Sequence, residues 1–104
     1  DSGKDGTKLT VKIISQAKKY LNSKGVLQLP MISLSNEKKI LKKAKKIFKK
    51  VEIIDKADWF LPNEMQNLHK YLENLKSKGH INFIKKFGRI ICTTSIITCA
   101  IIKK

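Results

Sequence analysis

The pattern of apolar and polar positions is clearest between Glu37 and Val51, where it has the period of a helix. Apolar side chains fall at i, i+1, i+4, i+7 and i+8, which places them on one helical face. Ser35 is a good N-cap for a helix that begins here. The other positions are mostly lysine, so the segment predicts a helix with one packing stripe and a basic surface for an anionic partner. The candidate partner-binding residues are Lys38, Lys39, Lys42, Lys43, Lys45, Lys46, Lys49 and Lys50.

Two further segments have helical periodicity. Residues 7–22 carry an apolar face and are followed by Gly25, which predicts a helix that ends in a left-handed glycine. A second segment begins at Asn63 and closes at residues 77–79. Residues 26–33 are expected to form a short extended connector between the first helix and the lysine-rich one.

The rest of the chain is harder to assign. The lysine-rich helix is expected to continue past Val51, with a break or kink near residues 52–55. The last segment, residues 81–104, has enough β-branched residues to suit strands. Its length, and the lack of another predicted strand to pair with it, favour a buried fourth helix. Together these elements predict an all-α fold, a small four- or five-helix bundle with an apolar C-terminal element.

The aromatic pair Trp59 and Phe60 allows two interpretations. Buried, the two rings would hold the expected kink against the core, which is the usual role of such aromatics and the one we favour. Exposed, they would form an anchor for a protein partner or a lipid interface.

A chain of 104 residues is long enough for one domain with a modest core. We expect residues 1–6 to be a flexible N-terminal tail and residues 7–104 a single helical domain, monomeric or weakly associating. The most apolar stretch, residues 90–102, is too short for a transmembrane helix. The polar start at Asp1 is what secretory processing leaves, although a recombinant protein trimmed by a protease begins in the same way. Secretion is the location we expect.

The formal net charge of +15, from 23 basic and 8 acidic residues, points to binding. Such a charge favours fast, salt-sensitive encounters with polyanions or anionic membranes. Arg89 is the only arginine, and lysine lacks the planar fork that suits base and phosphate recognition. Sequence-specific nucleic-acid recognition is therefore disfavoured. A bias in base composition would also enrich lysine, but it would not by itself arrange lysine around an apolar stripe.

Catalytic chemistry has little support in the sequence. The chain contains no nucleophile elbow, no glycine loop for phosphate and no paired histidine and glutamate motif. His69, His80, Cys92 and Cys99 lack the close pairing of ordinary zinc ligands. A small basic nuclease needs histidine, lysine and an acid, but no pattern brings these together. We therefore predict that the protein is not an enzyme and uses no cofactor, metal or small-molecule substrate.

Cys92 and Cys99 leave two alternatives open. In an unbroken helix their separation would be about 10 Å, which is too far for a disulfide. A secreted protein would usually oxidise the pair. We therefore expect a Cys92–Cys99 disulfide with a break near Thr94, and the alternative is two buried thiols that pack as small residues. Two free thiols would argue against secretion, and with it against a host-directed role.

The polar start DSGKDGTK, the length, the high lysine content and the two cysteines together resemble small secreted salivary proteins of blood-feeding flies. The resemblance is in particular to the very basic, helical anti-complement proteins of sand flies. It covers the profile of the whole chain rather than a motif. It implies a non-enzymatic inhibitor that binds a host plasma protein.

The leading hypothesis is therefore a secreted, non-enzymatic inhibitor of complement or haemostasis. It would bind an acidic host plasma protein or a sulfated polyanion through its lysine-rich surface. A membrane-active cationic toxin or antimicrobial protein is the first alternative, and it would place the apolar stripe of the lysine-rich helix in lipid. A nucleic-acid-directed effector is the second alternative.

Overall fold

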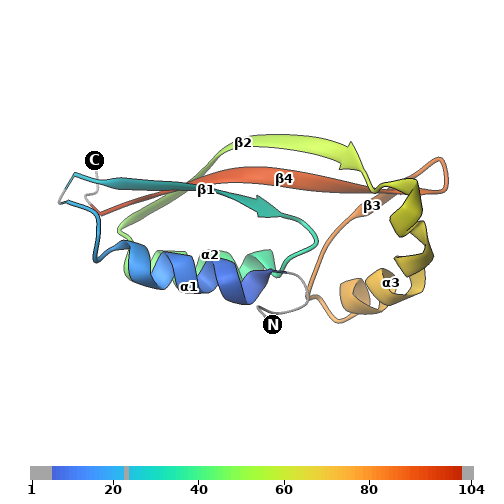
Figure 1. Ribbon diagram of the computed structural model, residues 1–104, viewed down its shortest axis with the longest axis horizontal. Coiled ribbons are helices and arrows are strands. Elements are labelled where there is room, and N and C mark those ends of the chain that lie inside the picture. The colour runs from blue at the N-terminus through green and yellow to red at the C-terminus, as the bar shows by residue number, and fades with distance from the viewer. Residues whose placement is uncertain (1–5, 23, 102–104) are drawn as a thin grey trace.

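The protein has a mixed α/β fold, so the predicted all-α bundle is wrong. The computed structural model describes residues 6–22 and 24–101, and most of the expected tail, residues 1–6, lies outside them. Three α-helices lie along one side of a four-stranded antiparallel sheet (Figure 1). In chain order the elements are α1 (Thr7–Ala17), β1 (Val26–Ile32), α2 (Glu37–Ile47), β2 (Lys50–Phe60), the 3-10 helix η1 (Asn63–Leu68), α3 (His69–Ser77), β3 (Ile84–Lys86) and β4 (Arg89–Ala100).

The sheet is organised around β4, the predicted fourth helix. β2 pairs with β4 from Phe60 opposite Ile91 to Lys50 opposite Ala100, and so occupies one of its edges. β1 and β3 both pair with β4 as well, so they lie end to end along the other edge. The break expected near Thr94 is absent, because that residue lies inside a continuous strand.

β4 is a strand because three other segments supply backbone partners for its whole length. Its β-branched residues, among them Ile90, Ile97 and Thr98, suit a pleated surface with close neighbours. The expected connector is likewise an edge strand, β1, with Pro30 inside it. Proline is tolerated at an edge because the missing N–H can face solvent rather than a ladder partner.

The lysine-rich helix does not continue into β2. It ends at Ile47, and Phe48 takes an extended backbone with φ −107° and ψ 144°. A β-bulge then shifts the register of β2 between Ile53 and Asp55. The bulge interrupts the alternation of faces that would have marked a strand in the sequence.

The other helix boundaries are partly as predicted. α1 begins at Thr7 as expected but ends at Ala17, earlier than residue 22. Gly79 follows α3 with φ +78°, so this segment closes at residues 77–79 as predicted, with a left-handed glycine. Gly25 is not left-handed. It is needed for space instead, because a Cβ at Gly25 would lie 2.9 Å from the Cβ of Leu21.

Two apolar clusters form the core, and both use β4. Ile97 and Cys99 of β4 join the α1–α2 cluster, and Ile90 and Cys92 join the α3 cluster. Successive strand residues face opposite ways, and the twist of a long strand turns its faces along its length. All three helices can therefore lie on one side of the molecule (Figure 1). The α1–α2 cluster contains Ile14, Leu29, Met31, Ile40, Ala44, Phe48, Ile97 and Cys99, and the α3 cluster contains Leu61, Leu72, Ile81, Phe83, Ile90 and Cys92.

Candidate functional site

The first candidate site is the outer surface of α2, and the cap of this helix fixes where it begins. Asn36, rather than the predicted Ser35, is the N-cap, and its Oδ1 accepts a hydrogen bond of 3.2 Å from the Lys39 N–H. The Ser35 hydroxyl donates instead to the Ile32 carbonyl at 2.6 Å, which closes the turn between β1 and α2. Glu37 in the first turn complements the positive end of the helix dipole.

The apolar stripe of α2 is buried against the sheet. Ile40 and Ala44 have no exposed surface, and Phe48 beyond the helix end is almost as deeply buried. The stripe therefore packs in the α1–α2 cluster, as predicted for a globular domain. The lysines of α2 consequently point away from the sheet, toward solvent.

α1 lies beside α2 and runs in the same direction. At one end the Asn36 N–H donates to the Thr7 hydroxyl at 2.8 Å, and at the other the Lys18 ammonium lies 3.4 Å from the Ile47 carbonyl. The two helices form one surface, and between residues 6 and 49 the described chain holds twelve lysines and a single acid, Glu37. We call the exposed lysines of these two helices the lysine layer: Lys8, Lys12, Lys38, Lys39, Lys42, Lys45 and Lys46.

The lysine layer contains five of the eight candidate lysines, and the other three fall outside it. Lys43 is half-buried and Lys49 is exposed in the link after α2. Lys50 begins β2 and pairs with Glu52 at 3.5 Å in a groove of about 510 Å³. Thr98 and Ala100, which also line that groove, are on the strand face away from α1 and α2. Lys50 is therefore not part of the lysine layer.

The lysine layer is not neutralised from within the described chain. Across residues 6–22 and 24–101, none of its ammonium groups forms an ion pair with a carboxylate. Burial raises the pKa of Glu37, the one acid nearby, while the charge of Lys56 works in the opposite direction. A shallow groove of about 470 Å³ runs along α2, lined by Lys38, Leu41, Lys42, Lys45 and Lys46. This surface is a concentrated, unpaired positive charge that an extended anion can reach.

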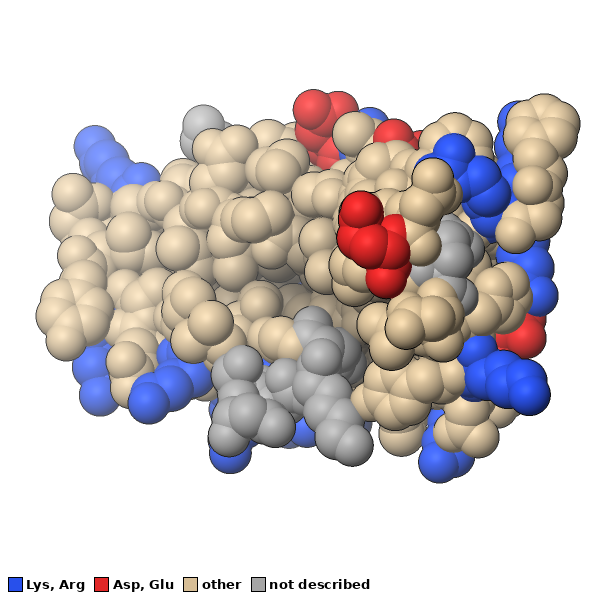
Figure 2. Space-filling model, turned by 45° about the vertical axis from the view of Figure 1, so that its right-hand side comes forward, with Lys and Arg blue, Asp and Glu red and all other residues tan. Residues whose placement is uncertain are grey.

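The acidic residues lie elsewhere. Glu52, Asp55 and Asp58 are all exposed on β2, at the edge of the sheet. In Figure 2 the middle of one face carries few charged side chains, and Lys and Arg gather around its lower and right-hand edges. The charge of the protein is thus unevenly distributed, and an anionic partner would be drawn to the helices rather than to β2.

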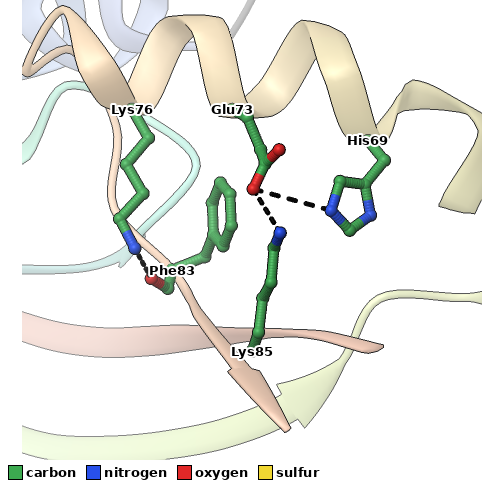
Figure 3. Close-up of polar contacts among 5 residues, drawn as sticks. All are labelled: His69, Glu73, Lys76, Phe83 and Lys85. Carbon is green, nitrogen blue, oxygen red and sulfur yellow. Dashed lines mark hydrogen bonds and ion pairs between the residues drawn. The ribbon is translucent and has the colours of Figure 1, made fainter. Parts of the chain in front are cut away.

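The two histidines, which no sequence pattern brought together with an acid, lie in different surroundings. His69 Nε2 is 3.6 Å from a Glu73 carboxylate oxygen on the next turn of α3, and the Lys85 ammonium contacts the same oxygen (Figure 3). The hydrogen bond from Lys85 lowers the pKa of Glu73. This trio contains the residue types of a small nuclease, and it lies between α3 and β3 with its side chains partly exposed (Figure 3). We interpret it as a polar contact that holds α3 against β3, and call it the α3–β3 contact.

A second interaction, made by Lys76, adds to the α3–β3 contact. The Lys76 ammonium donates to the Phe83 carbonyl at 2.5 Å and lies 4.6 Å from the centre of the Phe83 ring (Figure 3). His80 lines a groove of about 330 Å³ together with Lys76, Glu37 and Lys38. Among the described residues no group of three His, Cys, Asp or Glu side chains is placed to hold a metal ion.

The structure has Cys92 and Cys99 as free thiols, so the expected disulfide is absent. Seven residues of strand span about 23 Å, and a disulfide needs the two Cα atoms within about 7 Å. The two thiols are buried in different clusters, Cys92 beside α3 and Cys99 beneath α1 and α2. Burial raises the pKa of Cys92 and raises that of Cys99 to about 11. By the criterion stated above, two free thiols argue against secretion.

The two aromatics Trp59 and Phe60 lie in different surroundings, the first partly buried and the second exposed. Trp59 packs on the α3 cluster, and its indole N–H donates to the Thr94 hydroxyl at 2.9 Å. Phe60 is exposed, and the Arg89 guanidinium stacks on its ring at 4.4 Å. Sequence reasoning missed the β3–β4 hairpin that carries Arg89. The glycine after Phe87 was the available signal for its turn.

No protein-family model matches the chain, and no curated protein or solved structure does either. The described helices include none with the length and apolarity to cross a membrane. The geometry of the chain itself therefore carries the functional argument.

Proposed function

We propose that this chain is a non-enzymatic binding protein that holds a polyanion on the lysine layer of α1 and α2. The observation that supports the proposal is that this layer has no carboxylate partner within the described chain, while the apolar stripe beneath it is buried. Unpaired lysines keep their hydration and mobility, so they suit diffuse attraction to many anionic groups at once. A sulfated polysaccharide or an acidic protein surface fits such a site.

The resemblance to salivary inhibitors implies a more specific function, the inhibition of a host plasma protein. That specific role remains a prediction. The two free, buried thiols argue against it, because secreted proteins usually oxidise their cysteines. The proposal for a polyanion does not depend on the compartment. It depends on the charge and exposure of the lysine layer.

The burial of the stripe also separates this proposal from the membrane toxin. A toxin of that kind would insert Ile40 and Phe48 into lipid. Both side chains lie in the α1–α2 cluster, together with Ile97 of β4. Exposing them would require the helix to leave the core, so we do not favour disruption of a bilayer by α2.

The test compares two variants of equal charge. Lys39, Lys42, Lys45 and Lys46 of the lysine layer are changed to Gln in the first, and Lys24, Lys56, Lys70 and Lys78 in the second; all eight are exposed. Binding to a heparin oligosaccharide should weaken at least tenfold in the first variant and much less in the second, with unchanged circular dichroism. Wild-type affinity should also fall steeply as salt is raised. Equal losses in both variants would show that net charge, not the lysine layer, determines binding.

A further inference from the structure

The end of the molecule formed by the β3–β4 hairpin exposes apolar side chains that no described element covers. The fractional exposure is 86% for Phe87, 56% for Ile84 and 43% for Phe60. Ile84 and Phe60 both pair with Ile91, from opposite sides, so Ile84, Ile91 and Phe60 form a row on one face of the sheet, and Phe87 lies beyond it at the tip of the hairpin. α3 packs on the other face, because Ile90 and Cys92 join its cluster. The hairpin projects at the far end of the sheet (Figure 1).

The turn of this hairpin places a bulky side chain where one is rarely found. Lys86 pairs with Arg89, and the two residues between them, Phe87 and Gly88, have φ values of +55° and +71°. Two positive φ values in a two-residue loop define a type I′ turn, which favours Asn-Gly. A phenylalanine at positive φ is strained. Since Phe87 is exposed, packing inside the protein does not compensate for that strain. Backbone strain that internal packing does not compensate is typical of functional sites, so it indicates that Phe87 is kept for contact with a partner.

Cations flank the exposed row. Lys86 has its ammonium 5.9 Å from the centre of the Phe87 ring, and Arg89 stacks on Phe60. The Arg89 guanidinium also lies 3.4 Å from the Leu61 carbonyl, which holds it in place. Asp58, an acid two positions from Phe60 on the same face, accepts a hydrogen bond of 2.7 Å from the Thr93 hydroxyl. Lys86 and Arg89 outnumber Asp58 around the row, so its local net charge is positive, and in Figure 2 the right-hand end of the molecule shows more Lys and Arg than acidic side chains.

We propose that the hairpin end is an anchor for the surface of an anionic lipid bilayer. Phe87 enters the interface first, Ile84 and Phe60 follow, and Lys86 and Arg89 contact the lipid phosphates. The three residues from Phe87 to Ile84 span about 10 Å of strand, which matches the depth of about 5–10 Å reached by interfacial apolar groups. An aliphatic side chain such as Ile84 gains little from stacking on a nucleobase but gains from an apolar medium. The row therefore fits lipid better than single-stranded nucleic acid.

The experiment measures binding to vesicles of phosphatidylserine and phosphatidylcholine by sedimentation. The decisive variant is Phe87→Asn, because asparagine suits the turn and removes the apolar group. The matched control is Tyr20→Asn, since Tyr20 is 85% exposed and follows Lys18 and Lys19. We expect Phe87→Asn to weaken binding about tenfold, from the loss of a largely inserted aromatic ring. Tyr20→Asn should stay within about twofold of wild type on the same scale.

Electrostatic attraction by the lysine layer must be separated from anchoring. Both variants are therefore repeated with Lys39, Lys42, Lys45 and Lys46 of the lysine layer changed to Gln. The Phe87→Asn effect should persist in that background, because insertion is an apolar contribution that salt screens little. Equal vesicle affinity of Phe87→Asn and wild type, or no vesicle binding by wild type, would overturn the anchor. Loss of binding to single-stranded RNA in Phe87→Asn, with vesicle binding unchanged, would assign the hairpin to nucleic acid instead. Heparin binding of the lysine-layer variant and vesicle binding of Phe87→Asn are separate measurements, so the two proposals can fail independently.

Discussion

The backbone N–H of Asn36 donates to the hydroxyl of Thr7 at 2.8 Å, across 29 positions of the chain. Thr7 is the first residue of α1 and Asn36 is the cap of α2, so one bond joins the starts of the two helices. Both helices carry the lysine layer, and their like charges oppose close packing. This bond is thus one of the contacts that keep α1 and α2, the two helices of the candidate binding surface, side by side.

Thr7→Val should destabilise the protein by about 1–3 kcal/mol, because the Asn36 N–H would lose its partner at a site where Thr7 is almost fully buried. Urea unfolding followed by circular dichroism measures the free energy of unfolding. Thr7→Ser keeps the hydroxyl and should recover most of that loss. Equal destabilisation by both changes would mean that the methyl group of Thr7, not the hydrogen bond, matters.

Neighbouring isoleucines of β4 should differ sharply in their contribution to stability. Ile97 is fully buried in the α1–α2 cluster, whereas Ile96 is half-buried and on the opposite strand face. Ile97→Ala should cost about 2–5 kcal/mol in free energy of unfolding. Ile96→Ala should cost clearly less, because less apolar surface is lost. Similar costs at the two positions would contradict the strand assignment.

The α3–β3 contact of Glu73 with Lys85 should weaken in acid. The hydrogen bond from Lys85 lowers the pKa of Glu73, so the ionised carboxylate is favoured in the folded state. Its contribution to stability is present above the ordinary carboxyl pKa and is lost as the pH falls through the lowered value. Glu73→Gln should therefore lower the melting temperature at neutral pH, and its effect should shrink as the pH falls below the ordinary carboxyl pKa of 4.5 and through the lowered value.

Glu64→Gln provides the control for this pH series. Glu64 is exposed on η1 and forms no ion pair among the described residues, so its removal should leave the melting temperature nearly unchanged at every pH. If Glu64→Gln and Glu73→Gln lowered it equally at neutral pH, the effect would come from the overall charge rather than from the contact with Lys85.

Both cysteines should be free and unreactive in the native protein. Intact mass after alkylation in denaturant should show two modified thiols, and alkylation of folded protein at neutral pH should show almost none. Burial raises the pKa of Cys99 from 9.0 to about 11, so the folded state favours the neutral thiol. Its contribution to stability is therefore complete below pH 9.0 and is lost as the pH rises toward 11. Detection of a Cys92–Cys99 disulfide would contradict the continuous β4 strand.

The sequence came closest to the structure at the lysine-rich helix. The spacing of Ile40, Ala44 and Phe48 predicted which face would be buried, because helical periodicity depends on residues within two turns of each other. The exposed lysines of α2 followed from the same pattern. Lys50 was grouped with them wrongly, because the sequence does not show that α2 ends at Ile47 and that the next strand turns Lys50 toward Glu52.

What the sequence determined by itself was local: the start of α1, most of α2, the closure after α3 at residues 77–79 and the excess of positive charge. Only the tertiary structure decided that the remaining segments are strands. β4 pairs with β1 from Val26 opposite Ala100 inward, a contact between distant parts of the chain. β4 is also buried on alternate faces along its length, so its apolar residues show no simple alternation. A strand requires partners, and its partners are far away in sequence, whereas a helix carries its hydrogen bonds within itself.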